Sequence, residues 1–196
     1  NRAHWAKFGI KAAFFGFFEC VNDTNAANAL FGRVEQYCLE HGVDILEGPF
    51  NPNHYSELGL QVNKFGTTPS CFQTYNPDYY SRLIEHAGFE MMKIVHTRKR
   101  QNISEYINHR YGDIPTQTAS SEYTIRNFRR DDFDNDLEHI RDVFNDAFSN
   151  NWHFLPLSKE EYLFSAKFLN LVTKPELITI VEHNGEPVGV LECVQD

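Results

Sequence analysis

The sequence predicts an α/β fold with mixed sheets, and three observations support this. An apolar run at residues 11–21 precedes an amphipathic helix pattern and a second apolar run at residues 43–46. Later, one strand pattern, two helix patterns and two more strand patterns follow one another, the last two joined by Asn184-Gly185, a dipeptide typical of tight hairpins. Of the 196 residues, 41% are hydrophobic and 14% aromatic, which is enough for a folded core.

The first helix pattern has clear signals at both ends. Residues 22–25 (Asn, Asp, Thr, Asn) are types that cap helices, because their side chains accept hydrogen bonds from free backbone amides. Apolar side chains then recur at steps of three and four up to Cys38, and Gly42 suits the left-handed C-terminal position. The unit predicted is strand–helix–strand with parallel strands.

The second part of the chain has an equally clear pattern. A strand is expected at residues 123–128, and helices at residues 137–147 and 158–169. Ser158 and Glu161 are spaced as a capping box, in which each side chain bonds the other residue's backbone amide. A hairpin with strands at residues 177–181 and 188–194 closes the order.

Composition changes between residues 98 and 121, which makes this stretch the expected boundary. It opens on Arg98-Lys99-Arg100, carries a weak helix pattern and ends rich in Thr and Ser. The domains predicted are therefore residues 1–97, a linker with a short helix at 98–121, and residues 122–196. Because the chain starts without Met and stops directly after an apolar run, we expect an internal fragment of a longer protein.

Charge and residue spacing disfavour several classes of function. Eighteen basic and twenty-seven acidic residues give −9, the wrong sign for a nucleic-acid binder. No apolar run is long enough to span a membrane and no leader opens the chain, so we expect a cytoplasmic protein with no membrane partner. Four scattered cysteines predict reduced thiols, and nine histidines without metal-ligand spacing predict no metal site.

Five short phrases carry a resemblance to a known family. They lie at residues 15–20, 48–51, 75–80, 88–90 and 151–156, and the resemblance that they carry covers nearly the whole chain. With the element order above, they resemble tandem GNAT-like proteins. The resemblance implies a mixed, mostly antiparallel sheet flanked by helices, the GNAT-like acyl-CoA N-acyltransferase fold. The chain would hold the C-terminal half of a first GNAT-like unit and the N-terminal half of a second; the two halves could instead pack into one sheet, as a circular permutation.

The resemblance also points to a coenzyme loop. GNAT enzymes hold the pyrophosphate of acetyl-CoA or another acyl-CoA on a loop that precedes a helix, which here falls on residues 22–27 and makes Asn22, Asn25 and Ala27 the cofactor-binding candidates. Asn22 replaces the usual Gln or Arg, Asn25 replaces a Gly, and Asp23 adds a carboxylate beside the expected anion. The alternative is an ordinary helix capped by Asp23.

Two catalytic candidates follow from the same resemblance. The usual general-acid position falls on Ile84, which has no proton to give, whereas Tyr80 lies one helical turn earlier and could substitute. Glu19, within an apolar run, is the candidate general base. Both could instead be structural, with Tyr80 covering the sheet and Glu19 facing solvent.

Three functions stay open from the sequence. The first is acyl-CoA-dependent N-acyl transfer to a small-molecule amine, with a degenerate first unit. The second is a non-catalytic GNAT-like module that binds or supports a partner. The third, FemX-like transfer from aminoacyl-tRNA, conflicts with the net charge unless a local basic patch such as residues 98–100 compensates. An echo between residues 16–23 and 189–196, each containing Glu-Cys-Val, indicates either a duplication or a coincidence.

Overall fold

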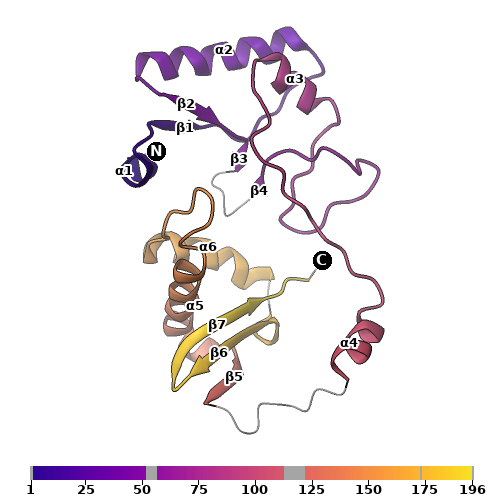
Figure 1. Cartoon of the computed structure of the whole chain (residues 1–196), viewed down its shortest axis with the longest axis vertical. Helices are drawn as coiled ribbons and strands as arrows, with labels where there is room; N and C mark the ends of the chain where they lie inside the picture. The colour runs from indigo at the N-terminus through magenta and orange to yellow at the C-terminus, as the bar shows by residue number, and fades with distance from the viewer. Residues whose placement is uncertain (1, 52–56, 113–121, 173, 196) are drawn as a thin grey trace. The chain divides into compact units, whose positions relative to one another are not determined.

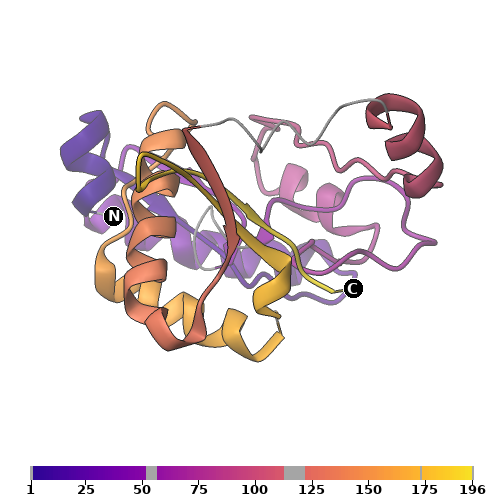
Figure 2. The same ribbon diagram turned by 90° about the horizontal axis from the view of Figure 1, so that it is seen from below.

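The computed structural model describes residues 2–51, 57–112, 122–172 and 174–195, and it confirms the α/β class (Figures 1 and 2). The chain forms two compact units: unit 1 holds Asn1–Met91 with Ser149–Pro156, and unit 2 holds Met92–Phe148 with Leu157–Gln195. The elements are α1 (Arg2–Phe8), β1 (Ala12–Phe14), α2 (Thr24–Glu40), β2 (Ile45–Glu47), β3 (Phe50–Asn51), β4 (Glu57–Leu58), α3 (Tyr80–His86), α4 (Ile103–Tyr111), β5 (Tyr123–Asn127), η2 (Arg130–Asp132), α5 (Phe133–Ala147), α6 (Lys159–Val172), η3 (Pro175–Leu177), β6 (Ile178–His183) and β7 (Glu186–Glu192).

Unit 1 contains the predicted strand–helix–strand arrangement. Strands β1 and β2 pair in parallel, with Ala12 opposite Ile45, and α2 connects them. Asp23 caps α2 by accepting a hydrogen bond from the Asn25 amide at 2.7 Å. After the helix, Gly42 has a φ of +60°, the left-handed conformation that glycine adopts without steric cost.

The long first strand predicted at residues 11–21 is corrected by the structure, because β1 ends at Phe14. The chain next turns at Phe17, whose φ is +53°. Before that turn, the Phe15 carbonyl accepts a hydrogen bond from the Phe50 amide at 2.9 Å. A Cβ on Gly16 would lie 1.9 Å from the Phe50 carbonyl oxygen, so only glycine permits this close approach of two backbones.

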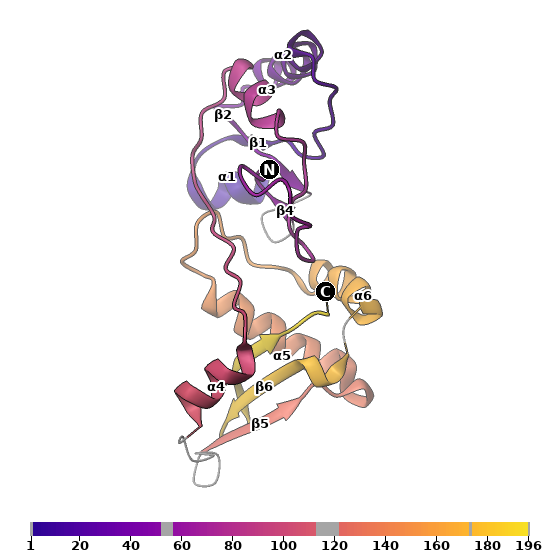
Figure 3. The ribbon, with the colours of Figure 1, turned by 90° about the vertical axis from the view of Figure 1, so that its right-hand side faces the viewer.

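An aromatic cluster forms the core of unit 1. The ring of Phe31, on α2, lies 4.8–5.2 Å (centroid to centroid) from the rings of Phe15, Phe18 and Phe89. Helix α3 adds Tyr80, whose ring contacts Phe18 at 5.0 Å. Figure 3 shows α2 and α3 next to each other, and these shared rings are what hold them there.

Three further segments of unit 1 carry sequence predictions. The composition of residues 71–75 and 89–96 predicts strands, but both have irregular backbone. A short helix is predicted at residues 54–58, which lie mostly outside the described residues, and Glu57–Leu58 pairs with Phe50–Asn51 as an antiparallel strand. A strand needs a partner for its backbone groups, and apolar composition alone does not supply one.

Unit 2 is a three-stranded antiparallel sheet with helices against it. The strand order is β5-β6-β7, and α5 runs alongside the sheet (Figure 2). The predicted turn is confirmed: Asn184 and Gly185 have φ values of +53° and +83°, both left-handed, as a type I′ hairpin requires. The predicted capping box also forms, with Ser158 and Glu161 bonded reciprocally at 2.9 and 3.2 Å.

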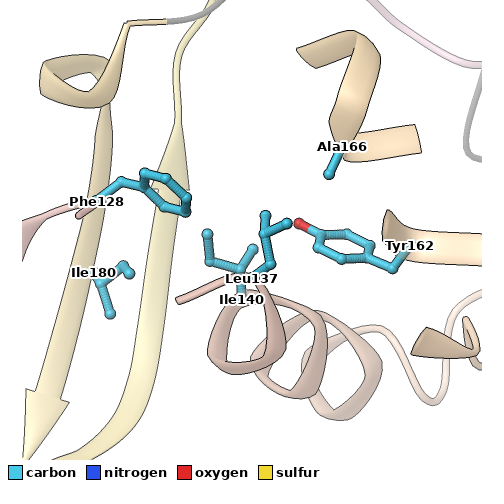
Figure 4. Packing of buried hydrophobic residues seen from close by; sticks show 6 residues of the cluster. All are labelled: Phe128, Leu137, Ile140, Tyr162, Ala166 and Ile180. Carbon is cyan, nitrogen blue, oxygen red and sulfur yellow. The ribbon is translucent and has the colours of Figure 1, made fainter. Parts of the chain in front are cut away.

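The core of unit 2 lies between α5, α6 and the sheet. Figure 4 shows Leu137 and Ile140 of α5 facing the ring of Phe128 and the side chain of Ile180, with Tyr162 and Ala166 of α6 completing the cluster. These positions follow the three- and four-residue spacing that predicted both helices.

A buried ion pair sits beside this core. Asp136, which is fully buried, accepts two hydrogen bonds from the Arg126 guanidinium at 2.8 Å each and one from the Arg129 amide at 2.7 Å. Burial alone would raise the pKa of Asp136, but these donors outweigh it and lower the pKa below the ordinary value. Arg126 also bonds Glu182 on β6, so the network joins the first strand of the sheet to α5 and to the middle strand.

The close approach at Gly16 generates a stability prediction. We expect Gly16→Ala to lower the free energy of unfolding of unit 1 by about 1–3 kcal/mol, because its Cβ must displace the Phe50 backbone. Both tryptophans, Trp5 and Trp152, belong to unit 1, so urea unfolding followed by tryptophan fluorescence reports on this unit. The matched control is Gly32→Ala within α2, where a Cβ meets nothing within 4 Å. This substitution should raise the free energy of unfolding by about 0.5–1 kcal/mol. Equal effects would contradict the role of Gly16.

The buried ion pair generates a second prediction. We expect Asp136→Asn to lower the free energy of unfolding of unit 2 by about 3–5 kcal/mol, because it leaves the Arg126 charge without its bidentate acceptor. Amide hydrogen exchange on β5 and β6 measures this. Since the folded pKa is lowered, the wild-type contribution is present above the ordinary Asp value and is lost as the pH falls through the folded value. Asp142→Asn, at an exposed pair, should change little.

Candidate functional site

The structure brings together the two catalytic candidates of unit 1. The Tyr80 hydroxyl donates a hydrogen bond to Glu19 Oε2 at 2.6 Å and accepts one from the Cys20 amide at 3.1 Å. Glu19 lies on the irregular segment after β1, whereas Tyr80 begins α3. These residues are 61 positions apart, and the turn at Phe17 brings the Glu19 segment to the helix.

Burial gives the two partners different properties. Tyr80 is only 3% exposed, and its burial, assisted by the hydrogen bond to Glu19, raises its pKa. The phenol is therefore protonated at neutral pH and acts as a donor. Glu19 is exposed to solvent and so is open to a ligand. Tyr79 adds a third contact, because its hydroxyl donates to the Cys20 carbonyl at 3.1 Å.

This geometry assigns different chemical capacities to the two side chains. A carboxylate held by a hydrogen bond and open to solvent can take a proton from an amine, directly or through water. The Tyr80 proton already points at Glu19, so in this arrangement the phenol orients the carboxylate. Acting as an acid toward a leaving thiolate would require Tyr80 to leave that bond.

The coenzyme-loop candidates surround the start of α2. The backbone amide of Asn25 donates a hydrogen bond to the Asp23 carboxylate. Ala27 is fully buried, and its backbone amide donates to the Asp23 carbonyl. Asn22 Oδ1 accepts a hydrogen bond from Arg82 on α3 at 2.5 Å.

These contacts do not suit a pyrophosphate. The Asp23 carboxylate already accepts a hydrogen bond from the Asn25 backbone amide, which would have to face a phosphate. The negative charge of Asp23 would also repel the phosphate oxygens. The side chain of Asn25 stands where close approach needs a glycine. Residues 22–27 therefore have the geometry of the alternative prediction, a capped helix, and no step of acyl transfer is assigned to them.

A second acid–base cluster lies in unit 1 and was not predicted. His4 Nε2 lies 2.7 Å from His153 Nδ1, and His153 Nε2 lies 3.0 Å from Glu47 Oε2. The second contact has the distance of an ion pair but not the alignment of a hydrogen bond. The three groups come from α1, β2 and the 149–156 segment, which is why no local sequence pattern revealed them. The sequence indicated this segment only through the phrase around Trp152, whose aromatic side chains are typical of core packing.

Burial shifts the pKa of both end groups of the cluster. His4 is 1% exposed, and burial foremost, then the neighbouring His153, lowers its pKa. Burial raises the pKa of Glu47, against the opposing attraction of His4. Both shifts favour the uncharged form of the end group, so the burial of His4 and of Glu47 acts in the same direction.

The row ties the 149–156 segment into unit 1. His153 has a φ of +53°, a conformation that costs a non-glycine residue about 1 kcal/mol. Neighbouring contacts offset this cost: Phe154 is 1% exposed, Lys7 Nζ donates to its carbonyl at 2.8 Å, and Trp152 stacks near Phe50. We assign the cluster an anchoring role, because its central imidazole already has a partner at both nitrogens.

Unit 2 repeats the carboxylate–phenol pairing. The Tyr162 hydroxyl donates to Glu192 Oε1 at 3.2 Å, and burial raises the pKa of Tyr162. Glu19 and Glu192 are the matching positions of the sequence echo between residues 16–23 and 189–196. Each unit thus pairs the Glu of a Glu-Cys-Val phrase with a helical tyrosine.

No group of His, Cys, Asp and Glu side chains that could hold a metal ion occurs within the described ranges. Within those same ranges, every helix is too short or too polar to cross a bilayer.

Two curated proteins are similar to nearly the whole chain. It is 24% identical over 192 residues to Protein YghO of Escherichia coli (strain K12), which is 96% of this chain and 48% of that protein. It is 28% identical over 184 residues to Bacterial ceramide synthase of Caulobacter vibrioides (strain NA1000 / CB15N), which is 90% of this chain and 46% of that protein. The chain thus spans about half the length of these relatives. No family model and no solved structure matches it, so the GNAT resemblance stays a prediction.

The histidine cluster generates a pH prediction. Because the folded pKa of His4 is lowered, the unfolded chain takes up its proton first as the pH falls through about 6.5. The contribution of His4 to stability is then lost. We expect His4→Phe, which keeps a ring against Phe8 and Phe14, to cost less at about pH 5.5 than at about pH 8. Urea midpoints from tryptophan fluorescence measure this cost.

The matched control for this prediction is His86→Phe, which removes an imidazole from an exposed position of α3. A cost of His4→Phe that stays constant between the two pH values would contradict a buried, neutral His4.

Proposed function

We propose that this chain belongs to an acyltransferase that moves a fatty acyl group from acyl-CoA to the amine of a long-chain amino alcohol. The proposal rests on the similarity to a protein named Bacterial ceramide synthase, which extends over 90% of this chain. A ceramide is the amide of a fatty acid with a long-chain amino alcohol. A family that makes one must therefore form an N-acyl bond.

The reaction needs one base and one proton donor. The amine nitrogen attacks the thioester carbonyl, a C–N bond forms, the C–S bond breaks, and coenzyme A leaves as a thiolate that is protonated to the thiol. An amine carries a proton at neutral pH and is not a nucleophile until it loses it, and a second proton leaves nitrogen as the amide forms. A base near the amine is therefore the first requirement.

We assign the base role in unit 1 to Glu19. Its carboxylate faces solvent, and Tyr80 holds it from the buried side with a 2.6 Å hydrogen bond. Tyr80 is then a positioning residue, supported by the amide of Cys20. We do not place the acyl donor on residues 22–27, because Asp23 opposes its phosphates there.

A second candidate function rests on the same loop. If unit 1 holds no coenzyme, it serves as a non-catalytic module of the larger protein, and Glu19–Tyr80 is a structural pair. The capped start of α2 favours this alternative, and the variants below separate the two.

The test is acyl transfer by the purified protein that contains this chain, with palmitoyl-CoA and a long-chain 2-amino alcohol. The amide product is measured by mass spectrometry, since exposed Cys193 would react with a thiol reagent. We expect Glu19→Gln to lower kcat by about 100- to 10,000-fold, the usual contribution of a general base. Tyr80→Phe should lower kcat by about tenfold and leave KM unchanged, because only the orientation of the carboxylate is lost.

The matched control is Glu85→Gln, an exposed carboxylate on the same helix as Tyr80, which should leave the rate unchanged. Full activity in Glu19→Gln would assign unit 1 to the non-catalytic alternative. Absence of amide from every acyl-CoA and amine tested would contradict the proposed function itself.

A further inference from the structure

The charge of the chain is distributed unevenly. Residues 92–112, which we call the basic–apolar segment, contain five basic side chains (Lys93, Arg98, Lys99, Arg100 and Arg110) and one acidic one, Glu105. The remaining residues hold thirteen basic and twenty-six acidic side chains. The chain, with a net charge of −9, therefore contains a cationic stretch whose local charge is opposite to that of the rest.

Apolar side chains in the same segment are exposed. Six of them have 45–66% of their surface open to solvent: Met92, Ile94, Val95, Ile103, Ile107 and Tyr111. Single exposed apolar residues need no explanation, but six within twenty-one positions are a local concentration of apolar side chains in contact with water. No residue of α4 is buried, so the helix covers no core of its own unit.

Helix α4 arranges these groups by type. Ile103, Ile107 and Tyr111 follow at steps of four and so share one face of the helix. Arg100 lies 3.8 Å from the ring centroid of Tyr106, and Arg110 lies 5.5 Å from that of Tyr111. Cations thus contact two tyrosines of the helix that carries this apolar face.

We infer that the basic–apolar segment is a docking surface for an anionic lipid bilayer. A bilayer surface presents phosphates to the cations and, directly beneath them, acyl chains to the apolar stripe. The long stems of Arg and Lys lie on apolar surface while their charges reach the headgroups, and tyrosine is suited to the same depth. The segment lies on this surface and does not cross it, since α4 has only nine residues.

Other anionic or apolar partners fit the segment less well. An RNA backbone would satisfy the cations but leaves the aliphatic side chains in water, and the tyrosine rings that could stack on bases are already covered by arginines. In a two-fold dimer through this segment, a second copy of this chain would place the same five cations against each other.

The test is cosedimentation of chain 1–196 with vesicles, which needs no catalysis and is therefore independent of the proposed function. We expect binding to equal parts phosphatidylcholine and phosphatidylglycerol, weak binding to phosphatidylcholine alone, and loss of binding as salt rises from about 0.1 to about 0.5 M. Arg98→Gln/Lys99→Gln/Arg100→Gln should lower the partition coefficient by about a hundredfold. Ile103→Ser/Ile107→Ser should lower it by about tenfold or more, with folding intact because neither side chain is buried.

The matched control is Arg33→Gln/Arg130→Gln/Lys174→Gln, which changes the net charge equally at exposed positions elsewhere and should bind as the wild type does. Equal loss in this control would show a dependence on total charge alone and would overturn the assignment. Failure to sediment with anionic vesicles would overturn it as well. So would binding of RNA without binding of vesicles, or a dimer in sedimentation velocity that the Ile103→Ser/Ile107→Ser variant dissociates.

Discussion

Unit 1 depends on the close approach of two backbone segments just after its parallel strands. Gly16 and Gly48 face the other segment reciprocally: a Cβ on Gly16 would meet the Phe50 carbonyl, and a Cβ on Gly48 would meet the Phe15 carbonyl at 2.4 Å. Hydrogen bonds of 2.9 Å from Phe15 to Glu47 and from Phe50 to Phe15 hold the segments together. Because neither glycine has a side chain, the two backbones can approach this closely, directly after β1 and β2 end.

The two acid–base clusters of unit 1 follow from this crossing. The segment after β1 turns and carries Glu19 to Tyr80, whereas β2 ends on Glu47 beside His4 and His153. The first cluster has one partner exposed and one buried, which suits proton exchange with a ligand. In the second, the central imidazole is occupied at both nitrogens, which suits anchoring. Burial, and not residue type, thus separates a candidate catalytic pair from a structural one.

The proposed function rests mainly on similarity along nearly the whole chain, and less on the local geometry of Glu19 and Tyr80. Acyl transfer rests on the relative named Bacterial ceramide synthase, and the helix start that should hold the coenzyme is occupied by Asp23. A bilayer-docking segment in the same chain would bring such a protein to the phase in which long-chain amines and their amides reside. The two proposals are compatible, and neither requires the other.

The sequence by itself determined the α/β class, helix α2 with its Asp23 cap, the capping box of α6 and the hairpin at Asn184-Gly185, because each depends on neighbours within a few positions. The predicted resemblance to GNAT-like proteins indicated Glu19 and Tyr80 as separate candidates. Tertiary structure decided that they meet, that residues 89–96 form no strand, and that His4, Glu47 and His153 lie in contact. Strand pairing and buried charge depend on which distant segments meet, and no local pattern records that.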